Sequence, residues 1–380
     1  MQKIKDFVKK EMVLVVAVVL AIGSMLVISP DKEYIGYMDF RTLSILFCLM
    51  AVMAGLQEAG VFQFVAEKLL RKVHRLWQLV LILVMLCFFF SMLITNDVAL
   101  ITFVPFAFSV LGLMGEEKER ELIIPVVVMQ TIAANLGSML TPVGNPQNLY
   151  LYGKAGLRLG EFIMLMLPYT LTALVLLAVY CLYLGKKAAN NGTARIGVIF
   201  GRQTVLKGRE PAILRYLILF VLCLLAVAGK IPYPVVLGIV AGMLAIFDPR
   251  LFAKIDYALL LTFAGFFIFI GNMGRVPAFY SFLQEMIEGN EVLTAVVSSQ
   301  VISNVPAALL LSGFTDNYEA LILGTNLGGL GTLIASMASL ISYKYISKEN
   351  KCSKGAYFGF FSIANLVFLA VLMILWVCIK

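Results

Sequence analysis

Apolar runs long enough to cross a membrane recur along the whole chain, separated by short polar segments. About twenty apolar residues span a bilayer, and only helices or closed barrels satisfy their backbone there. The runs are continuous rather than alternating, so they indicate helices. We therefore predict an all-α polytopic membrane protein. Full spans are expected near residues 12–29, 40–57, 122–152, 161–184, 213–229, 232–247, 256–271, 318–345 and 355–379.

Two further apolar blocks, 78–114 and 292–313, are each interrupted in the middle by a short polar motif. The first block contains "LITNDVAL", and the second contains "VISNVPAAL". A polar interruption between two short apolar arms predicts a helical hairpin that enters the membrane and returns to the side it left. Irregular backbone at this depth is tolerated only inside protein or beside a water-filled cavity. Both hairpin tips are therefore expected to line a cavity.

A third interruption, "TPVGNPQNLY", lies inside the apolar segment 122–152. Asn145 followed by Pro146 is typical of a helix start, because asparagine suits the N-cap and proline the first helical position. We predict a half-helix from about Pro146 to Tyr152. Its N-terminus would carry free N–H groups and partial positive charge, which favour an anion. The carbonyl groups that end the preceding segment would favour a hard cation.

The hairpin tips offer oxygen atoms from Thr95, Asn96, Asp97, Ser303 and Asn304. Side-chain and carbonyl oxygens suit a hard cation such as sodium, and the absence of thiolate or imidazole argues against a transition metal. Asp97 is the carboxylate that lies well inside an apolar block. Burying such an acid costs roughly 2.5–3.5 kcal/mol on insertion scales, so it is expected to bind a cation or carry a proton.

The two halves of the chain resemble each other. "MDFRTLSILF" from Met38 is echoed by "IDYALLLTFA" from Ile255, and the two hairpin motifs follow in the same order. The clearest match pairs "NLGSMLTPVGNPQNLYLY" from Asn135 with "NLGGLGTLIASMASLISY" from Asn326. Order and spacing agree across about 120 residues, which indicates an internal repeat.

Charge gives the orientation. The net charge is +8, and 23 of the 30 Lys and Arg residues fall in segments that lie on one side if the N-terminus is cytoplasmic. Basic residues collect in cytoplasmic loops, so this excess favours membrane topology over nucleic-acid binding. We expect an integral protein of a bacterial or archaeal cell membrane, with the N-terminus in the cytoplasm and the C-terminus outside. The first repeat then starts outside and the second inside, so the repeats are inverted.

Inverted repeats with broken helices are typical of secondary transporters, whose sites lie near the midplane where the breaks meet. The six cysteines are scattered and there is a single histidine, His74, so neither a disulfide framework nor a multi-histidine metal site is predicted. The domain boundaries that we predict are an N-terminal anchor helix at 1–38, a first inverted repeat at 39–184, a basic cytoplasmic linker at 185–212, a connecting pair at 213–254 and a second inverted repeat at 255–380.

These motifs carry a family resemblance that covers the chain from about Asp39 to Trp376. "TNDVALITFVP", "ISNVP" and "ANLGSMLTPVGNPQN" resemble the hairpin and broken-helix motifs of the ion transporter superfamily. That group includes arsenite permeases, NhaD-type sodium/proton antiporters, citrate permeases and divalent anion/sodium symporters, and the chain is most similar to a citrate-permease-like anion transporter. The resemblance implies a fixed scaffold, a transport region that moves by an elevator mechanism, and a homodimer.

The resemblance also implies site residues, because hairpin tips of sodium-coupled relatives bind sodium and the substrate carboxylate. Asp97 and Val305 stand where those relatives carry threonine, so the resemblance does not imply two equal sodium sites. Substrate contacts are expected at Asn96, Asn145, Pro146, Gln147, Asn148, Ser303, Asn304, Ser336 and Ser339. Coupling-ion contacts are expected at Thr95, Asn96, Asp97, Gly144, Asn145, Ser303 and Asn304, with a sodium ion at Asn96 and Asp97.

The preferred interpretation is a secondary active transporter that moves a small anion, such as a di- or tricarboxylate or an oxyanion. Sodium or a proton would be the coupling ion, and no other cofactor is expected. A sodium/proton antiporter that uses Asp97 is one alternative. An arsenite-type efflux permease is another, and pumping would then need a separate ATPase because the chain has no P-loop. We find no HExxH or GxSxG motif, so an enzyme is the weakest interpretation.

Overall fold

The computed structural model describes residues 11–189, 206, 208–349 and 352–380. Much of the linker predicted at 185–212 and the first ten residues lie outside this description. The described residues form helices and no strands. Six helices are long and apolar enough to cross a membrane: α4 (Phe40–Glu58), α8 (Glu116–Ser138), α10 (Leu159–Ala189), α11 (Glu210–Val227), α13 (Tyr257–Gly274) and α19 (Lys354–Ile379).

The other helices are shorter, and several are the arms of hairpins or halves of broken helices. In the first half they are α2 (Met12–Met25), α3 (Tyr34–Tyr37), α5 (Val61–Leu70), α6 (Leu76–Phe90), α7 (Asn96–Gly112) and α9 (Pro146–Ala155). In the second half they are α12 (Tyr233–Phe247), η1 (Pro249–Lys254), α14 (Pro277–Ile287), α15 (Glu291–Ile302), α16 (Asn304–Leu311), α17 (Tyr318–Leu327) and α18 (Met337–Lys348).

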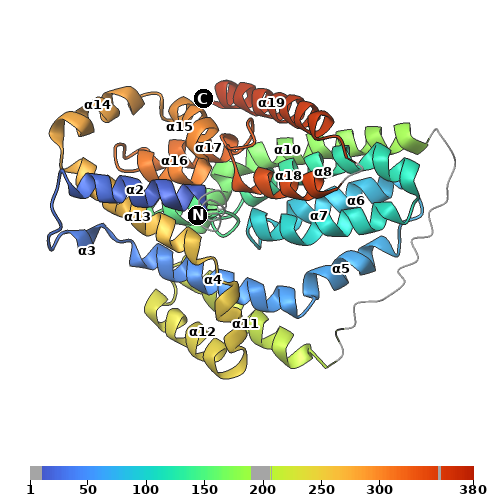
Figure 1. Cartoon of the computed structure of the whole chain (residues 1–380), viewed down its shortest axis with the longest axis horizontal. Coiled ribbons are helices and arrows are strands. Elements are labelled where there is room, and N and C mark those ends of the chain that lie inside the picture. Colours follow the sequence, from blue (N-terminus) through green and yellow to red (C-terminus); the bar gives the residue numbers. More distant parts are fainter. Residues whose placement is uncertain (1–10, 190–205, 207, 350–351) are drawn as a thin grey trace, which may run out of the picture.

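The helices form two groups (Figure 1). A flanking group consists of α2, α4, α11, α12 and α13, in which α4 packs on α11 and α12, and α13 packs on α2. A hairpin group consists of α6 to α10 and α15 to α19, with the two hairpins packed on α8 and α17. The groups touch where α4 meets α9 and where α13 meets α16.

The two halves repeat the same order of elements. A long helix of the flanking group (α4 or α13) is followed by a short helix, a hairpin, a broken helix and a final long helix. Even the starts agree, because the Asp39 carboxylate accepts from the Thr42 N–H and the Asp256 carboxylate from the Leu259 N–H. A side chain at the N-cap satisfies one of the free N–H groups of the first turn.

Two amphipathic helices, α5 and α14, were not predicted, and neither were the short elements α3 and η1. Helix α5 lies between the predicted span 40–57 and the predicted hairpin 78–114, and α14 lies between the predicted span 256–271 and the predicted hairpin 292–313. Both are short and amphipathic, so neither produces an apolar run that a search for spans would find. Each connects a flanking helix to a hairpin, and they occupy equivalent places in the two halves.

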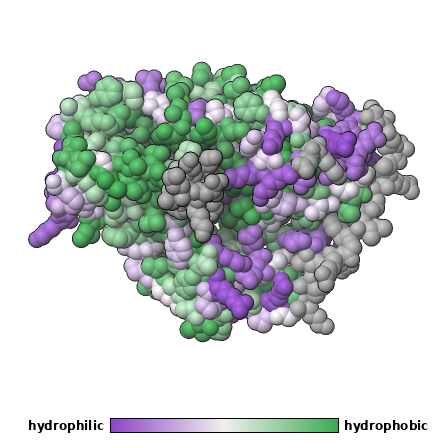
Figure 2. Space-filling model, in the orientation of Figure 1, coloured by the Kyte–Doolittle hydropathy of each residue, from purple (hydrophilic) through white to green (hydrophobic). Residues whose placement is uncertain are grey.

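The surface agrees with a membrane location. Large apolar side chains such as Val19, Phe282 and Val297 are more than 60% exposed, which is expected where lipid rather than water surrounds them. Figure 2 shows a broad hydrophobic area over the part of the face that contains α2, α13 and α14, with hydrophilic residues toward the opposite end. The protein is therefore an integral membrane protein, and its orientation stays a prediction from charge.

Candidate functional site

Each hairpin tip contacts the break of its own repeat through the same backbone hydrogen bond. The Asn96 N–H donates to the Gly144 carbonyl at 3.2 Å, and the Asn304 N–H donates to the Ala335 carbonyl at 2.9 Å. In both cases the first residue of a hairpin arm bonds the residue that precedes the N-cap of a half-helix. The starts of α7 and α9 therefore meet, as do the starts of α16 and α18.

A second pair of equivalent contacts secures the breaks. The Thr141 hydroxyl donates to the Met92 carbonyl, and the Thr332 hydroxyl donates to the Gln300 carbonyl at 3.1 Å. These residues correspond in the alignment of the repeats. Each break is thus tied both to the tip and to the incoming arm of its hairpin.

Asn135 of α8 joins the first repeat to the second. Its side-chain oxygen accepts hydrogen bonds from the side-chain amide of Asn96 and from the Ser336 hydroxyl, both at 3.0 Å. Its amide nitrogen donates to the Gly329 carbonyl at 3.4 Å. Asn135 is only 3% exposed, so these are buried bonds between the first hairpin, the first broken helix and the second break.

Asn326 of α17 makes the reciprocal connection. Its side-chain oxygen accepts a hydrogen bond from the side-chain amide of Asn145 at 3.3 Å. Its own side-chain amide donates to the side-chain oxygen of Asn148 at 2.6 Å. Asn148 also donates to the carbonyls of Ser138 and Thr141. The asparagine of each "NLG" motif therefore contacts the half-helix of the other repeat.

Sequence reasoning did not include Asn135 and Asn326 among the site residues. The signal was present, because "NLG" is identical in the two copies and begins their best-matching stretch. The glycines of the motif also allow a close approach between helices. A Cβ on Gly328 would lie 2.6 Å from the Ser299 hydroxyl, and one on Gly137 would collide with the Phe88 carbonyl.

The networks leave several buried polar groups without a partner. They are the side-chain oxygen of Asn145, both polar atoms of the Gln147 side chain and the hydroxyl of Ser339. All three residues are at most 3% exposed and lie at the starts of α9 and α18. A buried polar group without a hydrogen bond costs about 1–3 kcal/mol. This cluster can therefore bind a polar ligand or water.

The helix ends around the cluster favour a negatively charged ligand. The hydrogen bonds bring together the N-terminal ends of α7, α9, α16 and α18, where partial positive charge is greatest. The buried polar residues include no lysine or arginine in the part of the chain that the structure describes. Free N–H groups and amides, rather than side-chain cations, would meet the charge of an anion here.

Asp97 lies in the first turn of α7, where it is half-buried. Its N–H donates to the Asn96 side-chain oxygen at 2.9 Å, and its carboxylate Oδ1 is buried without a partner. Its counterpart Val305 is buried and apolar. Within the described ranges, no three His, Cys, Asp or Glu side chains gather in a group that could hold a metal ion. The sodium site at Asn96 and Asp97 stays a prediction.

The second hairpin tip has an unusual backbone. Ser303 has φ 73° and ψ 155°, a conformation that glycine adopts easily and other residues do not. It is the one non-glycine residue with positive φ in the described part of the chain. Its first-tip counterpart Thr95 has an ordinary extended conformation. Such strain persists only where the surrounding contacts hold the residue in place, which is typical of binding sites.

Comparison with known proteins agrees with this geometry. Residues 7–318 match the sequence profile of the family described as citrate transporter. A Methanocaldococcus jannaschii protein named as an uncharacterized transporter is 30% identical over 334 residues, which is 86% of this chain and 87% of that protein. The Escherichia coli inner membrane protein YbiR is 29% identical over 86% of both chains. The chain therefore belongs to the citrate transporter family and is a membrane transporter rather than an enzyme.

Proposed function

We propose that the protein is a secondary active transporter for a small anion, such as a di- or tricarboxylate or an oxyanion, coupled to sodium or protons. The observation that carries the proposal is the set of unpartnered buried polar atoms on Asn145, Gln147 and Ser339. They lie at the first turns of two half-helices, which favour negative charge. Gln147 is the strongest candidate, because its whole amide is buried and unpaired.

The arrangement of the two helix groups supports an elevator movement. The candidate site lies within the hairpin group, and only limited contacts join this group to α4 and α13. The hydrogen bonds of Asn135 and Asn326 link the two repeats inside the hairpin group. A unit held together in this way can move as one body and carry the site across the membrane.

Coupling would involve the first hairpin tip. The Asp97 carboxylate has a buried oxygen without a partner, and no ion pair joins it to a cation among the described residues. A sodium ion or a proton would remove the cost of this negative charge and would also reduce repulsion of the anion. Movement of the hairpin group would then be easiest when both the cation and the anion are bound.

Uptake by reconstituted liposomes tests this function. A panel of labelled carboxylates and oxyanions is measured with and without inward sodium or proton gradients. We expect gradient-driven uptake of one anion, and we expect Gln147→Leu to reduce it at least tenfold because the amide is lost at similar volume. Asn365→Leu is the matched control, since Asn365 is equally buried but lies in α19. Absence of uptake for the whole panel would refute the proposal.

The isolated carboxylate also favours a second candidate, a sodium/proton antiporter in which Asp97 binds each cation in turn. This function needs no anion. It predicts that sodium alone collapses a pH gradient in liposomes without any carboxylate or oxyanion present, and that Asp97→Asn abolishes the collapse. Anion-dependent uptake with a stable pH gradient would exclude it.

A further inference from the structure

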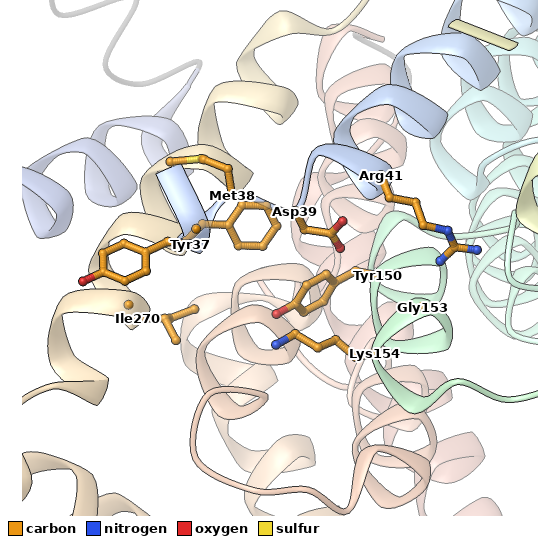
Figure 3. Close-up of a pocket in the computed structure, with 11 residues that line it drawn as sticks. Tyr37, Met38, Asp39, Arg41, Tyr150, Gly153, Lys154 and Ile270 are labelled. Carbon is orange, nitrogen blue, oxygen red and sulfur yellow. The ribbon is translucent and has the colours of Figure 1, made fainter. Parts of the chain in front are cut away.

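A pocket of about 440 Å³ lies between the flanking group and the hairpin group (Figure 3). Its wall consists of residues from the ranges 36–41, between the end of α3 and the start of α4, 150–154 of α9 and 267–271 of α13. Helix α9 has ten residues, so it is about 15 Å long. The N-terminus of α9 lies at the cluster of Asn145, Gln147 and Ser339, which we call the amide cluster, and its last turn lines the pocket. The pocket and the amide cluster are therefore separate sites.

The pocket carries an excess of positive charge. Arg41 and Lys154 line it, and no ion pair joins either of them to a carboxylate within the described ranges. Asp39 is the acidic residue in the wall, but its two oxygens accept from the N–H and the hydroxyl of Thr42. Asp39 therefore caps α4, and with Arg41 and Lys154 it leaves the pocket an excess of one positive charge.

Arg41 is held in position before any ligand binds. It donates through Nη2 to the Val227 carbonyl at 3.0 Å, at the end of α11. A Cβ on Gly153 would lie 2.7 Å from Nη1, so glycine at this position allows the guanidinium to lie against α9. A guanidinium has five N–H donors, and its planar shape suits carboxylates and oxyanions.

The two cations come from different groups of helices. Arg41 belongs to α4 of the flanking group and Lys154 to α9 of the hairpin group, as Figure 3 shows. Of the 30 Lys and Arg residues, 23 are predicted to be cytoplasmic, and Arg41 and Lys154 are among the other seven, which are predicted to lie outside. A concave site with an excess of one sign of charge raises the local concentration of a ligand of opposite sign.

We propose that this pocket is a second anion site, in which Arg41 and Lys154 bind a small carboxylate or oxyanion before it reaches the amide cluster. The inference rests on the proposed function and deepens it by naming where the anion is first bound. Because the cations lie on two groups that would move relative to each other, the site is complete only in an arrangement like the one observed. Bound anion would therefore favour this arrangement.

Chemical protection of a cysteine tests binding without transport. Gly36 lines the pocket, and a Cβ there would meet no atom within 4 Å, so Gly36→Cys adds a thiol without a clash. Cys352 and Cys378 are replaced by serine, and the other four cysteines are buried. The reaction with a charged thiol reagent is followed in phosphatidylcholine nanodiscs, which expose both faces and supply no anionic headgroup.

We expect citrate or sulfate to slow the reaction several-fold. Arg41→Gln and Lys154→Gln should each remove the protection, and Arg41→Lys should keep part of it. Lys230→Gln is the control, because this exposed lysine follows α11 near the same region but does not line the pocket. Equal protection in Arg41→Gln, Lys154→Gln and the parent, or no protection by either anion, would overturn the proposal.

Kinetics separate this inference from the proposed function. Arg41→Gln should raise the KM for uptake several-fold with little change in maximal rate, whereas Gln147→Leu should reduce uptake at least tenfold and retain cysteine protection. Protection without transport of any anion would refute the proposed function and leave the pocket intact. Transport without protection would refute the second anion site and leave the proposed function intact.

Discussion

The two hairpins and their breaks share a backbone arrangement but differ in what holds it. Both tips bond the residue that precedes the N-cap of a half-helix, which is Gly144 in one repeat and Ala335 in the other. The first break contains Pro142 and Pro146, which restrict its backbone, and the second contains no proline. There Gln300 donates to two break carbonyls and accepts from the Thr332 N–H.

This difference separates what the fold requires from what the chemistry requires. Contacts present in both repeats, such as those of Thr141 and Thr332, form the framework. Polar groups present in only one repeat are candidates for functions that the two repeats do not share. When the two repeats are aligned, Asp97 corresponds to Val305 and Gln147 corresponds to Ala338. The asymmetry favours one coupling-ion site at the first tip over two equal sodium sites.

The largest expected effect concerns Asp97 and its counterpart Val305. Asp97→Asn keeps the size of the side chain but removes its charge, so gradient-driven uptake should fall roughly a hundredfold, equivalent to about 2.8 kcal/mol. Val305→Asn changes the same position of the second tip and should retain coupling to the gradient. Both are measured as initial uptake with and without sodium and proton gradients.

Exchange of labelled for unlabelled anion at equilibrium provides the control. It needs no gradient, so the Asp97 variant should retain at least part of it if the fold is intact. If Asp97→Asn preserved full gradient-driven uptake, or if Val305→Asn abolished it equally, the asymmetry between the tips would not concern coupling.

The next effect concerns the close approach of each hairpin to its broken helix. In Gly137→Ala the new Cβ would collide with the Phe88 carbonyl, which is part of a helix backbone and cannot turn away. Overpacking of this kind costs about 1–3 kcal/mol. In Gly328→Ala the Cβ would meet the Ser299 side chain. We expect Gly137→Ala to lower the thermal unfolding temperature in detergent more than Gly328→Ala does, and the reverse order would contradict this view.

The sequence was sufficient to predict the class of fold and the places where helices break. The half-helix predicted from about Pro146 is α9, which starts at that residue because an asparagine and a proline occupy its cap and first position. The hairpins predicted at 78–114 and 292–313 correspond to α6 with α7 and to α15 with α16. Long apolar runs and proline have local effects, so a local pattern is enough to predict them.

The partners of the site residues could not be predicted in the same way. Asn96 is bonded to Asn135, and Ser336 is bonded to the same oxygen from the other repeat. These bonds depend on how two broken helices cross, which no local pattern contains. The pocket at Arg41 and Lys154 was missed for the same reason, because its two cations are distant in sequence and belong to different helix groups.

A moderate effect is expected from exchanging the residues that precede the two tips. Gln300→Met places in the second hairpin the residue found at position 92 of the first. The carbonyls of Gly328 and Leu330 would lose their donor, which costs about 1–2 kcal/mol for buried groups. Met92→Gln should change stability by less, since the first break is already restricted by proline. Thermal unfolding in detergent measures both, and equal losses would show that proline does not replace the glutamine.

The smallest effect, and the one with the opposite sign, concerns the backbone of the tips. Ser303 has φ 73°, whereas Thr95 has φ −65°, so glycine relieves strain at the first of these positions and only adds freedom at the second. Ser303→Gly should raise stability by about 1 kcal/mol, because the contacts of its hydroxyl at 3.4 Å and 3.5 Å are long. Thr95→Gly should lower it. If Ser303→Gly stabilises the protein but reduces anion uptake, the strained serine is retained for its hydroxyl, and the second tip then contributes to the anion site without a carboxylate. If stability falls, the hydroxyl holds the tip to the break more strongly than its distances indicate.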